Sequence, residues 1–389
     1  MELYPEIVDL HEEMTDWRQD LHAHPETAFE EHRTSDFVAK KLTDFGVDEV
    51  VRGLAGTGVV GIVRGRHGEG RAIGLRADID ALDISEQTNK PYASKNEGKM
   101  HACGHDGHTT MLLGAAKYLA ETRNFAGTVY LIFQPAEENE GGGRVMIEDG
   151  LFDKFPMEQV YGLHNWPGET AGRFSMRTGP VMASYDIFEI TVEGHGAHGA
   201  MPHQGIDPVV TAAQIVTGLQ SIASRNVDPI ESIVVSVTQI HGGDAYNVIP
   251  ETVELKGTVR TFKPHIQDLA ERRISEVATS IAEAHGARAE VRYERRYPPT
   301  VNAAAETENA ANVAAKIVGK DMVRTDVPPV MGSEDFAFML NEKPGNYIFL
   351  GCGEHVSNVH SPQYDFNDEI LPIGATYWAK LVEETLPAK

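Results

Sequence analysis

Cysteine is scarce in this sequence, with only Cys103 and Cys352 among 389 residues. Two thiols in a chain of this length form no disulfide framework, and such usage fits a reducing compartment. Long apolar runs are also missing: none approaches the roughly 18 residues that cross a bilayer. The first residues lack a basic stretch followed by an apolar one, so no secretory signal is expected. The sequence therefore predicts a soluble, cytoplasmic protein.

Positively charged residues are few: the sequence has 34 Lys and Arg residues and 58 Asp and Glu residues, which gives a net charge of −24. A body this acidic repels phosphate backbones and anionic lipid, which argues against nucleic acid or a membrane surface as a partner. The hydrophobic fraction of 41% and the charged fraction of 24% are ordinary for a globular protein and exclude a disordered chain. At about 150 residues per domain, two or three domains are expected.

The two ends of the chain show strands interleaved with helices. Apolar runs of strand length without alternation are typical of strands buried on both faces of a parallel or mixed sheet. Between them lie apolar residues at three- and four-residue spacings, which favour helices. The predicted strands are 58–64, 71–76, 128–133, 160–163 and 346–350, and the predicted helices cover 5–46 and 109–122. This order predicts an α/β fold with a sheet covered on both sides.

The middle of the chain has a different pattern. Residues 184–293 read as strand, helix, strand, strand, helix, strand, and the strands alternate between apolar and polar residues. That order is the ferredoxin-like arrangement, and 110 residues suffice for a compact domain. We therefore predict an inserted α+β domain at 184–293 within a discontinuous domain formed by 1–183 and 294–389.

The densest cluster of chemically reactive side chains is His-Ala-Cys-Gly-His-Asp-Gly-His at 101–108. The Cys103 thiolate and the His105 imidazole, two residues apart in a glycine-containing loop, can reach one divalent ion such as Zn²⁺. Taken alone, this pattern is more often a capped loop whose histidines satisfy backbone groups.

Other metal-binding residue types follow the predicted strands. Glu137 and Glu138 follow 128–133, His164 follows 160–163, and a loop leads from 346–350 to His360. Ligands of open α/β sheets bind beyond the carboxyl ends of the strands, so these side chains are expected to meet at one edge. This shared polarity favours a metal site over scattered core histidines.

The two adjacent glutamates are expected to have different roles. Consecutive side chains on extended backbone point in opposite directions, so Glu137 and Glu138 should divide into one metal ligand and one free carboxylate. A carboxylate beside a metal-bound water can act as a general base. In isolation the pair would be an ordinary solvated acidic loop.

Several long motifs resemble a known family, in order along nearly the whole chain. They are the run 100–116, Gln-Pro-Ala-Glu-Glu at 134–138, Gly-Leu-His-Asn at 162–165, Ala-His-Gly-Ala-Met-Pro-His at 197–203, Gly-Ser-Glu-Asp-Phe at 332–336 and the run 360–368. They look like the metallo-amidohydrolase family of aminoacylases and carboxypeptidases, in the branch of hippurate hydrolase, N-acyl-amino-acid amidohydrolases and indole-acetyl-amino-acid hydrolases. The resemblance implies a dinuclear metallopeptidase-like domain interrupted by a ferredoxin-like lid that often dimerises.

The resemblance also implies roles for individual residues. It implies that Glu137 is the general base and that His198 of the lid helps to stabilise the oxyanion, often from the partner subunit. With five ligands for two metal ions, something must bridge, and the Cys103 thiolate is the candidate. The implied ligands are Cys103, His105, Glu138, His164 and His360.

Two lid residues are weaker candidates for binding the substrate carboxylate. Asn247 precedes a Val-Ile-Pro segment, and Arg260 lies on the polar face of a predicted strand, from which a guanidinium can form paired hydrogen bonds. The alternative for Arg260 is an ordinary exposed strand residue. Which subunit's site they would serve is left open.

The resulting hypothesis is hydrolysis of an N-acyl or N-aroyl amino acid by a cytoplasmic enzyme with two divalent ions, Zn²⁺, Mn²⁺, Co²⁺ or Ni²⁺. The expected assembly is a dimer or tetramer formed through the lid. A dipeptidase or carboxypeptidase with the same site is the main alternative. An inactive metal-retaining binding protein and a purely structural zinc site are less favoured, because neither uses a free glutamate beside the metal.

Overall fold

The computed structural model describes residues 1–138 and 140–388, and in it the chain forms two compact units. The larger unit contains Met1–Val181, Val301–Pro329 and Asp335–Lys389, and the smaller contains Met182–Thr300 and Val330–Glu334. None of the helices in the described ranges is both long and apolar enough to cross a bilayer. The role of the smaller unit as a dimerising lid stays a prediction.

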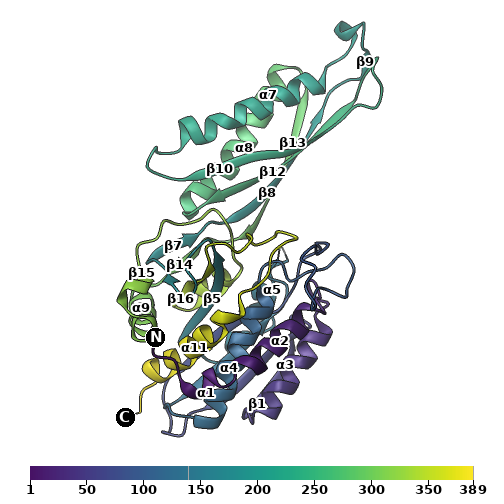
Figure 1. Ribbon diagram of the computed structural model, residues 1–389. Coiled ribbons are helices and arrows are strands. Elements are labelled where there is room, and N and C mark those ends of the chain that lie inside the picture. The colour runs from purple at the N-terminus through teal and green to yellow at the C-terminus, as the bar shows by residue number, and fades with distance from the viewer. Residues whose placement is uncertain (139, 389) are drawn as a thin grey trace. The chain divides into compact units, whose positions relative to one another are not determined.

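A mixed sheet of eight strands forms the centre of the larger unit (Figure 1). Parallel pairing joins β3 to β4, β3 to β5 and β5 to β16, whereas β2 is antiparallel to β1 and β4. The predicted α/β class is therefore confirmed. In spatial order the strands are β1 (Glu49–Leu54), β2 (Gly58–Arg64), β4 (Thr128–Gln134), β3 (Ala72–Asp78), β5 (Gln159–Pro167), β16 (Gly345–Gly353), β6 (Phe174–Ser175) and β15 (Val323–Arg324).

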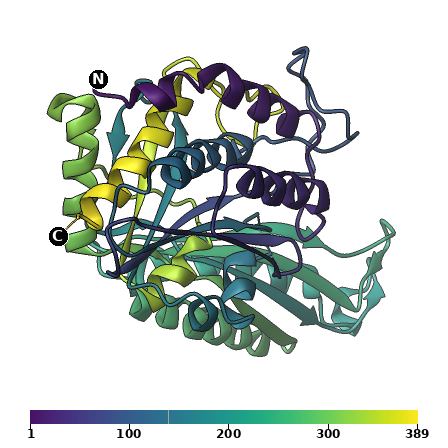
Figure 2. The same cartoon turned by 90° about the horizontal axis from the view of Figure 1, so that it is seen from below.

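Helices cover both faces of this sheet. Figure 2 shows α2, α3, α4, α9 and α11 on one side, where α4 packs on β3 and against α11, and α5 with α10 on the other. The larger group comprises α2 (His11–His22), α3 (His32–Asp44), α4 (His105–Thr122), α9 (Ala304–Val318) and α11 (Leu371–Thr385). The others are α1 (Pro5–Val8), α5 (Gly142–Glu148), α6 (Leu151–Lys154) and α10 (Phe336–Glu342).

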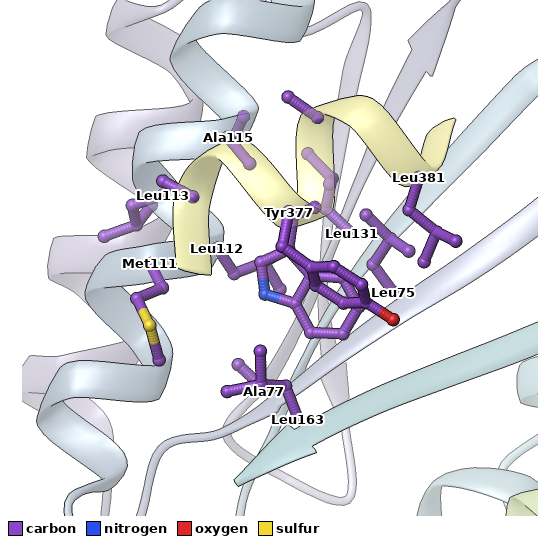
Figure 3. Packing of buried hydrophobic residues seen from close by; sticks show 14 of the residues in the cluster. Leu75, Ala77, Met111, Leu112, Leu113, Ala115, Leu131, Leu163, Tyr377 and Leu381 are labelled. Atoms are coloured by element: carbon purple, nitrogen blue, oxygen red, sulfur yellow. The ribbon is translucent and has the colours of Figure 1, made fainter. Parts of the chain in front are cut away.

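The core beneath α4 fixes the helix over the strand ends. Leu75, Leu131 and Leu163, from three neighbouring strands, are buried with Leu112 of α4 and Tyr377 of α11 in one apolar cluster (Figure 3). Truncating a buried leucine of this kind to alanine typically costs about 2–5 kcal/mol. The packing holds the first residue of α4, His105, beside the carboxyl ends of β3 and β5.

The helical character predicted for residues 5–46 is confirmed, except for a break that was not predicted. Three helices cover this range, with a break at residues 23–31 between α2 and α3. Pro25 cannot donate a backbone hydrogen bond and restricts the residue before it, and Phe29 has a left-handed φ of 62°. Because the apolar periodicity continues on both sides of the break, the sequence pattern alone does not reveal the break.

The smaller unit has the strand order β10-β12-β8-β13, all antiparallel, with α7 and α8 packed on the sheet. This is the predicted ferredoxin-like arrangement. In chain order its elements are β8 (Tyr185–Glu193), α7 (Pro208–Ser221), β10 (Ile233–His241), β12 (Thr252–Thr261), α8 (Pro264–Ala284) and β13 (Arg288–Tyr297). A separate ribbon joins β9 (Ala197–His198) to β11 (Val248–Ile249).

Candidate metal centre

The carboxyl ends of the parallel strands bring the predicted ligand segments to one edge of the sheet. The last residues of β3 and β4, Asp78 and Gln134, are paired in register, and His164 lies in β5 next to β3. The loop after β16 returns to the same place, since the backbone N–H of His360 donates to the carbonyl of Ala102 at 2.7 Å. His360 has a left-handed φ of 63°, a strained conformation for a residue with a side chain.

Two groups of three side chains share the Cys103 thiol. Cys103, His105 and His164 have ligand atoms within 4.8 Å of one another, and so do Cys103, Glu138 and His360. The Cys103 Sγ atom lies 3.3 Å from His164 Nε2, and His360 Nε2 lies 3.0 Å from Glu138 Oε1. The five residues are those predicted as metal ligands, and the structure brings them together.

In each buried histidine of the first group Nδ1 donates a hydrogen bond to a backbone carbonyl, so Nε2 is the nitrogen that can bind a metal. His105 Nδ1 donates to the backbone and side-chain oxygens of Asp80, both at 3.0 Å, and its Nε2 is buried without a hydrogen-bond partner among the described residues. His164 Nδ1 donates to the carbonyl of Asn165 at 2.6 Å. In the neutral imidazole this arrangement places the lone pair on Nε2, the form in which histidine binds a metal.

His108 also faces this edge, but both of its ring nitrogens are engaged. Its Nδ1 donates to Asp78 Oδ1 at 2.6 Å, and its Nε2 accepts from the backbone N–H of Asn165 at 2.9 Å. Although Asp78, His105 and His108 form a third close group, His108 has no lone pair left. It positions its neighbours rather than binding a metal.

The electrostatics of the site favour bound positive charge. Burial alone would lower the pKa of His105, but Asp78 and Asp80 raise it to about 10. Burial, followed by the charges of Glu138 and Glu137, raises the pKa of the Cys103 thiol well above its usual value. Since a thiolate here needs a compensating cation and His105 keeps an unused buried nitrogen, this donor set fits divalent metal ions.

Glu137 and Glu138 do not point in opposite directions. One ligand atom each from His105, Glu137 and Glu138 lies within 4.8 Å of the others. The expectation of divergence is wrong because it assumed extended backbone, whereas β4 ends at Gln134 and residues 137–138 form a turn. The preceding Ala136 has a left-handed φ of 53°, which turns both carboxylates toward the same site.

The predicted lid residues lie in the smaller unit, where they form two separate places. His198 pairs with Val248 in the β9–β11 ribbon, and the Gly199 N–H donates to the carbonyl of Asn247 at 2.7 Å, so His198 and Asn247 are neighbours. His198 Nδ1 accepts from the Ala200 N–H at 3.1 Å, which leaves a proton on the exposed Nε2.

Arg260 is not beside them. It lies eight residues beyond Thr252 on β12, roughly 25 Å along the strand, and its guanidinium is 4.1 Å from the centre of the Tyr185 ring. A single small molecule bound at His198 and Asn247 of one smaller unit is therefore out of reach of Arg260 of that unit.

Sequence reasoning missed a supporting residue of the site, Asn165. Its Nδ2 donates to the Cys103 carbonyl at 2.7 Å, and its Oδ1 accepts from the Tyr364 hydroxyl at 2.6 Å. It thereby connects the loops that carry Cys103 and His360. The sequence did offer one indication of its role: Asn165 directly follows His164 in a motif that the family resemblance included.

Comparisons with known proteins agree with this geometry. The model of peptidase family M20/M25/M40 matches residues 74–384. Hippurate hydrolase of Campylobacter jejuni is 43% identical over 381 residues, 98% of each chain. An IAA-amino acid hydrolase of Arabidopsis thaliana is 39% identical, covering 97% of this chain and 87% of that protein.

Further matches extend the range of relatives. Thermostable carboxypeptidase 1 of Saccharolobus solfataricus is 37% identical over 98% of each chain. The crystal structure of a Bacillus subtilis protein described as a dinuclear metal-binding peptidase from the M20 family is similar with a TM-score of 0.85 and 35% identity, covering 98% of this chain and all of that one. With matches of this extent, the chain belongs to peptidase family M20/M25/M40.

Proposed function

We propose that this protein is a metal-dependent amidohydrolase that cleaves an N-acyl or N-aroyl amino acid into a carboxylic acid and a free amino acid. One observation carries the proposal: two groups of ligand side chains share the Cys103 thiol, and the Glu137 carboxylate lies beside them. The names of the relatives support the substrate class, since hippurate hydrolase and IAA-amino acid hydrolases are named for acylated amino acids.

The site is proposed to hold two divalent ions. One ion would be held by Cys103, His105 and His164. The other would be held by Cys103, Glu138 and His360, so that the Cys103 thiolate would be shared between the two. Mixed sulfur, nitrogen and oxygen donors suit Zn²⁺, Mn²⁺, Co²⁺ or Ni²⁺. When bound, such ions polarise the amide carbonyl and lower the pKa of bound water toward about 7.

Glu137 is the proposed catalytic base and acid. It is 6% exposed, not among the five proposed ligands, and close to His105 and Glu138, so its carboxylate can take a proton from water at this site. The proton then passes from Glu137 to the leaving nitrogen of the amide. Water loses one proton and the amine gains one, so the glutamate returns to its starting state.

His198 and Asn247 are proposed to act on the substrate from the lid. His198 keeps a donor proton on Nε2 because Nδ1 accepts from Ala200, and a donor aimed at a developing oxyanion is worth roughly 3–4 kcal/mol. Asn247, its neighbour in the ribbon, would bind the substrate carboxylate. Arg260 remains a second candidate for that carboxylate, in a different place on the lid sheet.

The proposed assembly is a dimer or tetramer formed through the smaller unit. Its two edge strands differ: β10 contains no Lys, Arg, Asp or Glu, whereas β13 alternates between both signs. An uncharged edge is the one suited to pairing with a second copy. A cytoplasmic location is proposed because Cys103 and Cys352 are unpaired, and Cys103 must stay reduced to bind metal.

A substrate panel tests the activity. Purified protein loaded with Zn²⁺, Mn²⁺, Co²⁺ or Ni²⁺ is incubated with N-acetyl amino acids, N-benzoyl amino acids and dipeptides, and Glu137→Gln serves as the matched control. We expect hydrolysis of acyl amino acids, and a loss of about 10²–10⁴-fold in kcat for Glu137→Gln at unchanged metal content. Cleavage of dipeptides alone would favour the alternative that the carboxypeptidase relative supports. No cleavage of any amide would leave a metal-retaining binding protein.

A further inference from the structure

Glu31 is a fully buried carboxylate that the proposed reaction does not use. It precedes α3 in the break after Pro25 and is 0% exposed. No ion pair to Glu31 occurs within residues 1–138 and 140–388, so its charge has no cationic partner there. Burying a carboxyl group without a cationic partner costs free energy unless hydrogen bonds compensate for it.

Its two oxygens connect segments that are distant in sequence. Oε2 accepts a hydrogen bond from the Thr57 hydroxyl at 2.6 Å, in the turn before β2. Oε1 accepts from the backbone N–H of Ala136 at 2.9 Å, in the loop after β4. The second bond reaches the residue immediately before Glu137.

Ala136 is the point at which that loop turns. Its φ of 53° is left-handed, a conformation that costs roughly 1–2 kcal/mol for a residue with a Cβ atom. The N–H of Ala136 donates to Glu31, and the carbonyl of Ala136 accepts a hydrogen bond from the Gly142 N–H at 2.9 Å. Beyond the turn, the N–H of Glu138 donates to Asp80 Oδ2 at 3.0 Å, so the Glu137–Glu138 segment is fixed at both ends.

We propose that Glu31 is a positioning residue, which holds Ala136 in its left-handed conformation and so aims the Glu137 and Glu138 carboxylates at the same site. The inference rests on the proposed function for the roles of these two glutamates. The side-chain oxygen of Glu31 supplies the acceptor that the buried N–H of Ala136 requires.

Three variants separate this role from general stability. Glu31→Gln keeps an acceptor for Ala136, Glu31→Leu removes it at similar volume, and Thr57→Val removes only the other hydrogen bond of the same carboxylate. Each is loaded with Co²⁺, and kcat, KM, bound cobalt and the visible absorption of the cobalt centre are measured. We expect Glu31→Leu to lose about 100-fold in kcat with KM little changed, because misplacing a catalytic group by about 1 Å has an effect of this size.

The cobalt spectrum gives a readout that does not depend on turnover. We expect its ligand-field bands to change in Glu31→Leu, because Glu138 shifts, and to match wild type in Glu31→Gln and Thr57→Val. Wild-type kcat and spectrum in Glu31→Leu would overturn the proposal. So would equal losses in Glu31→Leu and Glu31→Gln, which would indicate only a requirement for the ionised side chain.

Failure of the proposed function would look different. If the wild type cleaves no acyl amino acid, the spectra and a crystal structure of Glu31→Leu still test whether Ala136 leaves its left-handed conformation. If Glu31→Leu does not fold, Glu31→Ala is measured in the same way. An unchanged φ at Ala136 with an unchanged spectrum would overturn the positioning role in either variant.

Discussion

Cys103 stands out among the residues of the site because both groups of candidate ligands include its thiol. Burial, followed by the charges of Glu138 and Glu137, raises the pKa of this thiol well above its usual value, so in the metal-free protein it stays protonated at neutral pH. Metal binding must therefore release its proton, and metal affinity should fall as the pH is lowered.

Replacing this thiol should remove metal. We expect Cys103→Ser to lose most bound metal, because a hydroxyl is a poor bridging ligand for these ions. Cys352→Ser is the matched control, since Cys352 is also buried but belongs to neither group of ligands. Elemental analysis after gel filtration checks both variants. Equal metal content in Cys103→Ser and wild type would contradict a thiolate bridge.

Glu31 should make stability depend on pH. Burial, then the charge of Asp80, raises its pKa from 4.5 to about 7. A raised folded-state pKa means that its contribution is fully present below pH 4.5 and is lost as the pH rises through 7. The expected loss is on the order of 3 kcal/mol.

The measurement compares wild type with Glu31→Gln. Urea unfolding of the metal-free proteins at pH 4.5 and 7.5 gives the free energy of unfolding of each. We expect wild type to lose stability relative to Glu31→Gln between these two values, because only the carboxyl group ionises. If the free energies of unfolding of wild type and Glu31→Gln change equally between pH 4.5 and 7.5, the pKa of Glu31 is not raised in the folded protein.

At the scale of elements, the start of α4 determines where the ligand loop lies. Gly104 precedes this helix with a φ of 90°, and a Cβ atom there would lie 2.4 Å from Asn165 Nδ2 and 2.6 Å from the Tyr364 hydroxyl. Only glycine permits both the backbone conformation and this approach.

Gly104→Ala should therefore both destabilise the protein and weaken metal binding. The left-handed backbone costs roughly 1–2 kcal/mol and overpacking about 1–3 kcal/mol more. Gly168→Ala is the control, because its φ of 84° carries the same backbone cost while nothing lies within 4 Å. Thermal unfolding and metal titration of both variants check this. Equal effects in the two would mean that the close approach at Gly104 is unimportant.

The elements also show what a sequence can predict here. Strand polarity predicted that residues following 128–133 and 160–163 would meet at one edge, because parallel pairing leaves little choice of direction. The break at Pro25 was not predicted because the apolar periodicity continues on both sides of it. The turn at Ala136 was not predicted because it depends on a tertiary hydrogen bond to Glu31, far away in the sequence. Glu31 was missed for the same reason: its partners Thr57 and Ala136 are 26 and 105 residues away.

For the whole molecule, the division into two units predicts an uneven response to metal. All five proposed ligands belong to the larger unit, whereas His198 and Asn247 belong to the smaller. A ligand that binds only the folded state stabilises it by about 4 kcal/mol at a thousandfold excess over Kd.

Chelation should therefore lower the unfolding temperature of the larger unit alone. We expect a shift on the order of 10 °C in the calorimetric transition assigned to it, and little change in that of the smaller unit. Calorimetry with and without a chelator measures both, and the smaller unit's transition is the internal control. Equal shifts in both transitions would contradict a site confined to the larger unit.

The strained loop that carries His360 has a consequence for how the protein would acquire its ions. The His360 side chain is 51% exposed, whereas those of His105 and His164 are almost fully buried. An ion held by Cys103, Glu138 and His360 would therefore lie nearer to solvent than one held by Cys103, His105 and His164. We expect two exchange rates from one bridged centre, so that the outer position follows the metal supply of its surroundings while the inner one keeps the ion with which the chain folded.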